Sequence, residues 1–262
     1  MNTRSTRHER SDLCLVFGSS MIDTPTILVI GGTRGTGLLI ARLLQERRCS
    51  VRVLARDPAA AKETLGRKVE VVAGDITQKR TLPTAINGAS HVIFTAGCRS
   101  GHPASQARIK ATEYEGVLNT LSSAEQAGFA GRFLYMTSSG VATRSFVSAC
   151  LNLYKGNTLG WRRRAEDAIR GCGLDYTIIR TGMLLNSLGR GRTIQVTQEA
   201  LPLSIRYRIG RADVAKVFVA SLEEPRTSRA TFEIVWARGE PKPLTAMLED
   251  LKSDKELAAA AA

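Results

Sequence analysis

Apolar, often β-branched runs alternate along the chain with segments in which apolar residues recur every three or four positions. The first pattern is typical of buried strands, and the second of amphipathic helices. The predicted strands are Thr26–Ile30, Val51–Ala55, Val69–Ala73, His91–Ala96, Arg132–Thr137, Asp175–Arg180 and Thr231–Trp236. Because strands and helices alternate, we predict an α/β fold with one doubly wound parallel sheet and helices on both faces.

Four amphipathic segments are the predicted helices. They are Gly37–Arg47, about Ser105–Ala127, Trp161–Arg170 and Arg211–Leu222. In the first of these segments, one apolar stripe is expected, as for a helix that packs one side on a sheet, and it consists of Leu39, Ile40, Leu43 and Leu44.

The two ends and one internal segment break this pattern. Residues 1–23 lack both a sustained period and the ~7 to 15-residue apolar core of a secretion signal, so we expect a disordered extension, and Met21 would itself make an ordinary start. Residues 183–209, rich in Gly, Arg, Pro and Thr, predict a small, loop-rich lid, called the lid region below. Residues 253–262, which end in LAAAAA, predict a flexible tail. We therefore expect one domain over residues 24–252.

Composition narrows the class of protein. The chain has 262 residues, of which 43% are apolar, enough for a sizeable core. No apolar run approaches the ~20 residues that span a bilayer, so we expect no membrane partner. The five cysteines are scattered and form no metal-binding spacing or disulfide framework. These features favour a cytoplasmic protein without a metal site.

The net charge of +13 could attract nucleic acid, an acidic membrane surface or a polyanionic cofactor. The arginines are spread along the chain, and their densest cluster is Arg162–Arg164. No interleaved aromatic residues or recognition-helix pattern accompany them, so a nucleic-acid partner is the weakest of the alternatives. A polyanionic cofactor accounts for the charge as well.

A glycine-rich stretch, IGGTRGTG, follows the first predicted strand and opens the first predicted helix. In a dinucleotide-binding turn, Gly31 would permit the tight turn, Gly35 would let the backbone approach a pyrophosphate, and Gly37 would let the helix pack closely on the sheet. The helix N-terminus would offer free amides to the phosphates. The residues predicted to bind the cofactor in this stretch are Gly31, Thr33, Arg34, Gly35, Thr36 and Gly37.

Further segments follow in a characteristic order. They are LARDP, AGDI, FTAG, YEGVLNTLSSAEQAG, MTSSG, GLDYTIIRTG and RADVAKV. With the Gly31-x-x-x-Gly35-x-Gly37 spacing, this set resembles the atypical, NmrA-like branch of the short-chain dehydrogenase/reductase superfamily, an NAD(P)-binding group related to biliverdin and flavin reductases. The resemblance covers roughly Thr26–Trp236 and implies a Rossmann-type sheet.

The resemblance also implies where the cofactor lies. Asp75 and Ile76 would border the adenine, and Ala96 and Gly97 would line the cofactor groove. Alternatively, these residues have purely structural roles: the first two would form a turn at a strand end, and the last two a tight backbone corner.

Charge at the end of the second strand bears on the choice of cofactor. NADP-selective sites place a cation there for the 2′-phosphate, whereas NAD-selective sites place a carboxylate there for the ribose. Arg56 lies 19 residues beyond Gly37, and Arg34 within the glycine turn is a second cation. Both favour NADP. NAD remains the alternative if Asp57 faces the ribose, although Asp57 before Pro58 is also a good helix-start pair.

Superfamily reductases pair a tyrosine proton donor with a lysine four residues later, and this chain lacks that pair. Tyr154, the candidate donor, is followed four positions later by Thr158. In WRRRAE, Arg162 takes the position where relatives carry lysine, and Arg164 is the second choice. Arginine can donate hydrogen bonds to a ribose but cannot relay protons near neutral pH. Alternatively, Arg162 and Glu166 form an opposite-charge pair on a solvated helix face.

Ser139 follows the fifth predicted strand, at the position of the superfamily's catalytic serine. Its hydroxyl could bind a substrate carbonyl or the nicotinamide amide. Alternatively, Ser138 and Ser139 cap the turn after the strand.

The leading functional hypothesis is an NADP-dependent oxidoreductase that transfers hydride to a small carbonyl, quinone or flavin-like acceptor. Flavins and quinones accept hydride without a strong acid, so the missing tyrosine and lysine pair is compatible with catalysis. The alternative is a non-catalytic NADP(H)-binding redox sensor or scaffold with a protein partner. Substrate and oligomeric state have no signal in the sequence.

Overall fold

A computed structural model describes residues 25–98, 105–143, 146–154, 156–188, 192–240 and 242–261. Its main sheet has eight strands in the order β3-β2-β1-β4-β5-β6-β10-β8. These strands are β1 (Thr26–Ile30), β2 (Ser50–Ala55), β3 (Glu70–Ala73), β4 (Ala89–Phe94), β5 (Arg132–Ser138), β6 (Asp175–Thr181), β8 (Thr193–Thr197) and β10 (Ala230–Ala237). Neighbouring strands pair in parallel except β8, which is antiparallel to β10. The predicted doubly wound Rossmann-type sheet is confirmed.

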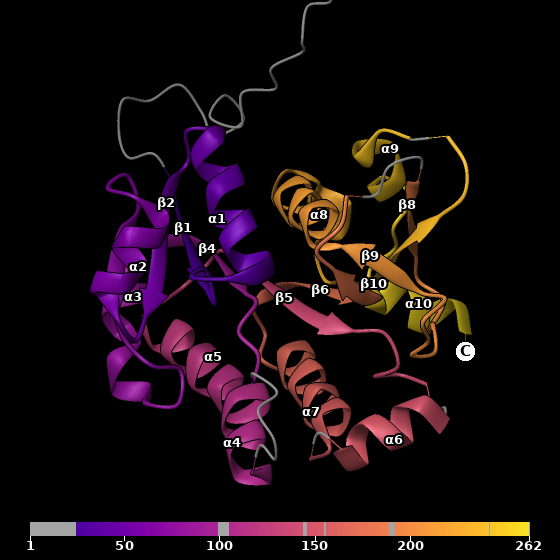
Figure 1. Cartoon of the computed structure of the whole chain (residues 1–262), viewed down its shortest axis with the longest axis horizontal. Coiled ribbons are helices and arrows are strands. Elements are labelled where there is room, and N and C mark those ends of the chain that lie inside the picture. Colours follow the sequence, from indigo (N-terminus) through magenta and orange to yellow (C-terminus); the bar gives the residue numbers. More distant parts are fainter. Residues whose placement is uncertain are drawn as a thin grey trace, which may run out of the picture.

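Helices cover both faces of this sheet. In Figure 1, α1 and α8 lie above the sheet, and α4, α5 and α7 lie below it. The helices are α1 (Gly35–Glu46), α2 (Pro58–Leu65), α3 (Pro83–Ile86), α4 (Gln106–Lys110), α5 (Gly116–Gln126), α6 (Phe146–Tyr154), α7 (Thr158–Gly171), α8 (Arg211–Glu223), α9 (Leu244–Leu248) and α10 (Asp254–Ala261). Short turns lie at Lys79–Thr81 and Pro225–Thr227, and a π-helical turn, Ala111–Glu115, joins α4 to α5.

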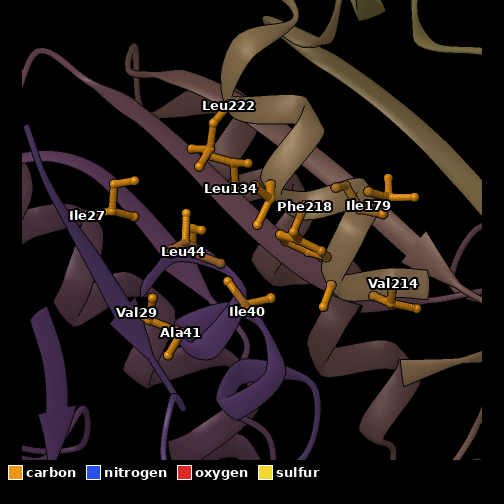
Figure 2. Close-up of a cluster of buried hydrophobic side chains, with 14 of the residues drawn as sticks. Ile27, Val29, Ile40, Ala41, Leu44, Leu134, Ile179, Val214, Phe218 and Leu222 are labelled. Carbon is orange, nitrogen blue, oxygen red and sulfur yellow. The ribbon is translucent and has the colours of Figure 1, made fainter. Parts of the chain in front are cut away.

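Each face of the sheet has its own apolar core, because successive strand residues point to opposite faces. On one face, Ile40 and Leu44 of α1 and Phe218 of α8 are buried against β1, β5 and β6. Figure 2 shows these side chains converging on Val29 and Ile179. The other face buries a second cluster under α5 and α7. The predicted stripe of the first helix therefore faces the sheet.

The lid region differs from the expected loop, since it contains three strands. β7 (Met183–Leu185) and β9 (Arg208–Gly210) pair with each other in parallel, and β8 extends the main sheet. Ile194 and Val196 of β8 pack against the core cluster. In the sequence, the apolar residues of TIQVT alternate with polar ones, which is typical of a strand. The surrounding Gly and Arg residues obscured this pattern.

The expected flexible tail differs as well, because residues 254–261 form α10. The Ser253 hydroxyl accepts a hydrogen bond from the Glu256 amide, and the Glu256 carboxylate accepts one from the Ser253 amide. This reciprocal pair is a capping box, which starts a helix that the alanines favour. Asp254 accepts hydrogen bonds from Tyr176 and Thr231 and so fixes the helix to the sheet.

The predicted extension over residues 1–23 lies outside the described residues. Within the described ranges, no helix combines the length and apolar character needed to cross a bilayer. The same ranges hold no group of three His, Cys, Asp or Glu side chains arranged to bind a metal ion.

Candidate functional site

The glycine turn after β1 is shaped by close backbone contacts. Gly31 has a φ of +87°, and a Cβ there would lie 2.7 Å from the Ala96 backbone nitrogen. A Cβ on Gly37, within α1, would collide with the Gly31 carbonyl oxygen and the Thr95 hydroxyl. No side chain fits at either position without displacing backbone. The tight turn and the close helix packing that the sequence predicted are therefore present.

Gly35, by contrast, faces open space. Its φ is +55°, and the nearest described atom to an added Cβ is Nη1 of Arg211, at 3.8 Å. The first turn of α1 contains no acidic residue, and its N-cap, Arg34, makes no side-chain capping hydrogen bond. The amides of this turn and the positive end of the helix dipole are thus suited to an anion. This cradle fits the phosphates of a dinucleotide.

A cleft of about 490 Å³ opens beside the glycine turn, at the carboxyl ends of β1 to β4. Small-molecule sites have volumes of roughly 300–1,000 Å³. The predicted cofactor residues that line this cleft are Gly31, Thr33, Arg34, Arg56, Asp75, Ile76, Ala96 and Gly97. The other three, Gly35, Thr36 and Gly37, form the adjoining first turn of α1. The fold thus brings the whole predicted set together.

Three arginines line the cleft, and sequence reasoning found two of them. Arg34 and Arg56 were predicted, whereas Arg108 of α4 was missed because its place depends on how α4 folds over the end of β4. Asp57, the carboxylate that would favour NAD, accepts a hydrogen bond from the Ala60 amide at 3.1 Å and caps α2. The cleft wall at the end of β2 therefore presents cations.

The loop after β3 is held rigidly against the cleft. Asp75 Oδ1 accepts hydrogen bonds from the Thr77 amide and hydroxyl, both at 2.9 Å. The Ile76 carbonyl accepts one from Asn119 Nδ2 at 2.9 Å. A Cβ on Gly116 would lie 2.8 Å from Ile76 Cδ1, so α5 approaches Ile76 closely. Asp75 and Ile76 are thereby fixed at the position predicted for the adenine.

Arg162 of α7 is turned toward the groove rather than toward solvent. Its Nε donates to Glu113 Oε2 at 2.8 Å, and its Nη2 lies 3.2 Å from a Cβ added to Gly97. Glu113 Oε1 also accepts a hydrogen bond from the Cys98 amide at 2.9 Å. Burial disfavours the charge of Arg162, but the Glu113 carboxylate, together with Tyr135 and Glu166, outweighs burial and raises the pKa of the guanidinium. One buried carboxylate therefore ties α7 to the cofactor groove.

The alternative interpretation of Arg162, a solvated pair with Glu166, is wrong. Glu166 is fully buried and accepts hydrogen bonds from Arg170 at 3.1 Å and from Arg180 at 2.7 Å. The sequence did not point to Glu113, because a single glutamate within a predicted helix looks like an ordinary solvent-exposed residue. It lies in the π-helical turn between α4 and α5, a geometry that is frequent at functional sites.

Ser139, a predicted catalytic residue, is fully buried beneath the lid region. Its amide donates to the Thr181 carbonyl at 2.9 Å. The next residue, Gly140, has a φ of +86°, and a Cβ there would lie 2.7 Å from Leu203 Cβ. The lid region therefore packs directly on the end of β5 and covers Ser139.

Glu233 of β10 is a buried carboxylate on which the Ser139 hydroxyl acts. It is 1% exposed, and its Oε1 accepts a hydrogen bond from the Leu201 amide at 3.0 Å. Burial raises the pKa of Glu233, while the Ser139 hydroxyl, the Leu201 amide and Arg180 act in the opposite direction. Glu233 thus anchors the lid region over β5.

Tyr154, the predicted proton donor, is the last residue of α6, and its side chain lies outside the described part of the structure. Of the predicted catalytic residues, Arg162 lies beside the groove and Ser139 lies under the lid region. The described residues therefore bring the predicted cofactor set together, and of the predicted catalytic set they place Arg162 and Ser139.

Comparison with known proteins places these features in context. Residues 31–225 match a family described as NAD(P)H-binding. Sanguinarine reductase from Eschscholzia californica is 29% identical over 246 residues, covering 80% of this chain and 88% of that protein. A candidate NAD-dependent epimerase/dehydratase from Bacillus halodurans has a TM-score of 0.72 and 24% identity, covering 87% of this chain and all of that one (100%).

An anaerobillin reductase from Escherichia coli O157:H7 has a TM-score of 0.67 and 22% identity, covering 83% of this chain and 100% of that one. The two solved structures have the same fold as this chain. The family match confirms the predicted NAD(P)-binding family, and the two structures support the predicted fold.

Proposed function

Because the chain belongs to the NAD(P)H-binding family, we propose that it is an NADPH-dependent oxidoreductase acting on a small carbonyl, quinone or flavin-like acceptor. The names of two relatives, sanguinarine reductase and anaerobillin reductase, support the reduction of a small molecule. The glycine cradle, open at Gly35 and closed at Gly31 and Gly37, is the feature that fits the phosphates.

The observation that supports NADPH over NADH is the charge at the end of β2. Arg34, Arg56 and Arg108 line the cleft, and Asp57 is occupied in capping α2. A guanidinium binds a phosphate through paired, charge-assisted hydrogen bonds, so this wall suits a ribose 2′-phosphate. The same wall offers no carboxylate for the free ribose hydroxyls of NAD at the position of Arg56.

The remaining groove residues have an orienting role. Bound NADPH supplies the hydride. Arg162, held by Glu113 next to Gly97, would donate hydrogen bonds to the nicotinamide half of the cofactor. The sequence lacks the paired tyrosine and lysine of superfamily reductases, which favours acceptors that need no strong acid, such as quinones and flavins.

The direct test follows NADPH oxidation by its absorbance, with purified full-length protein and a panel of quinones, flavins and small carbonyls. We expect turnover with at least one quinone or flavin, and less turnover with NADH at equal concentration. Tight NADPH binding without turnover across the panel would contradict the proposal.

One observation favours a second candidate, a non-catalytic NADP(H)-binding sensor. Ser139 is fully buried under the lid region, so its hydroxyl is not presented to a substrate in this conformation. A sensor would bind NADP⁺ and NADPH, would turn over no member of the panel, and would bind a protein partner in a manner that depends on the redox state. These outcomes separate it from a reductase.

A further inference from the structure

A cation outside the cleft lies against the glycine turn. Arg211 is the first residue of α8, directly after β9. Its Nη1 lies 3.8 Å from a Cβ added to Gly35 and 3.4 Å from Thr36 Oγ1. Gly35 and Thr36 are the first two residues of α1, so the guanidinium reaches the positive end of that helix.

The position of Arg211 is fixed by tight packing around it. Helices α1 and α8 share one apolar core, in which Figure 2 shows Ile40 and Phe218 side by side. At Gly210, just before Arg211, a Cβ would lie 2.7 Å from both the Ser187 carbonyl oxygen and the Trp236 ring. The start of α8 therefore cannot shift without moving the lid region or β10.

The charge of Arg211 is not neutralised within the described chain. Its two side-chain hydrogen bonds go to neutral groups, Asn186 Oδ1 at 2.9 Å and Thr36 Oγ1 at 3.4 Å. Asp213 is the nearest acidic residue on α8. Its carboxylate accepts a hydrogen bond from Trp236 Nε1 at 2.8 Å and forms an ion pair with Lys216 Nζ at 3.0 Å. No described carboxylate lies within 4.0 Å of the Arg211 guanidinium. A cation held by neutral partners beside a helix N-terminus is suited to an anion.

We propose that Arg211 binds the pyrophosphate of the dinucleotide, and that Asn186 of the lid region positions its guanidinium. This inference rests on the proposed cofactor binding. Under this proposal, the arginines of the site bind two different parts of the cofactor, the 2′-phosphate and the pyrophosphate. Arg56 faces the end of β2, where a 2′-phosphate would lie, whereas Arg211 faces Gly35, where the backbone is open to the pyrophosphate. Through Asn186 the lid region would respond to cofactor binding.

Calorimetric titration of the full chain with NADPH and with NADH tests the assignment. Both cofactors carry the pyrophosphate, and NADPH alone carries the 2′-phosphate. We expect Arg211→Gln to weaken both by about 10-fold or more, and by similar factors, as for the loss of a charged hydrogen bond. Arg56→Gln should weaken NADPH alone. The matched control is Arg206→Gln, an exposed arginine of the lid region, which should change neither affinity.

Two further variants guard against misfolding. Arg211→Lys keeps the charge and should retain more affinity than Arg211→Gln, and Asn186→Ala should weaken both cofactors by about 2- to 5-fold. Wild-type affinity in Arg211→Gln, or a loss restricted to NADPH, would overturn the inference. Cofactor binding without turnover would instead defeat only the proposed enzymatic function. A wild-type protein that binds neither NADPH nor NADH would overturn both.

Discussion

The two halves of the site are built differently. At the glycine turn, the geometry is set by backbone contacts among Gly31, Gly37 and the end of β4. Beside β5, each group is held by a side chain far along the chain: Arg162 by Glu113, 49 residues away, and Leu201 by Glu233, 32 residues away. The first half depends on the absence of side chains, and the second on buried carboxylates that bind a guanidinium or a backbone amide.

This difference predicts different sensitivities. A backbone cradle cannot accommodate added volume, because peptide groups cannot move aside as a flexible side chain can. A buried charge pair tolerates changes of shape but responds strongly when one partner is neutralised. The predictions below separate these two behaviours.

Gly37→Ala should have the largest effect. The added methyl group would collide with the Gly31 carbonyl and the Thr95 hydroxyl, so the turn must open. We expect NADPH affinity to fall at least about 100-fold and the free energy of unfolding to fall by about 1–3 kcal/mol. Titration and urea unfolding measure these changes. Gly171→Ala is the control, because nothing lies within 4 Å of its added Cβ, and normal NADPH binding by Gly37→Ala would refute the cradle.

Glu113→Gln should have the next largest effect. Arg162 would keep a buried charge without its carboxylate, which we expect to lower the free energy of unfolding by about 2–4 kcal/mol and to weaken NADPH binding severalfold. The control is Glu115→Gln, two positions away, where the exposed pair with Lys110 should contribute about 0–1 kcal/mol. Equal losses in the two variants, in urea unfolding, would show that Glu113 has no special role.

Protonation of His91 should have the smallest effect. It should change the free energy of unfolding and leave cofactor binding unchanged. Burial, followed by the charge of Arg132, lowers the pKa of His91 from 6.5 to about 4. The unfolded chain therefore binds more protons between these values, so stability is full above pH 6.5 and is lost as pH falls toward 4. We expect the free energy of unfolding to fall by about 1–2 kcal/mol from pH 7 to pH 5.

His91→Gln should flatten that slope in urea unfolding experiments and leave NADPH affinity at pH 7 unchanged. His91 lies on β4, before the residues of the same segment that line the cleft. An unchanged slope in the variant would assign the pH dependence to other groups.

The sequence predicted the elements of the main sheet well, because apolar periodicity is a local property. The first strand was placed at its observed bounds, and the last lies within one residue of them at each end. The lid region was read as a loop because β8 is stabilised by pairing with β10, which follows it by more than thirty positions. Propensity alone does not reveal such an edge strand.

The sequence by itself determined which residues are predicted to bind the cofactor. Strand, glycine turn and helix are contiguous, so the residues of the phosphate cradle and Arg56 could be named from their spacing. The tertiary structure alone decided the rest. It brought Arg108 to the cleft, Glu113 to Arg162 and Arg211 to Gly35, and it buried Ser139 under the lid region. These contacts join segments distant in the chain, and their partners are chosen by packing, which leaves no local pattern in the sequence.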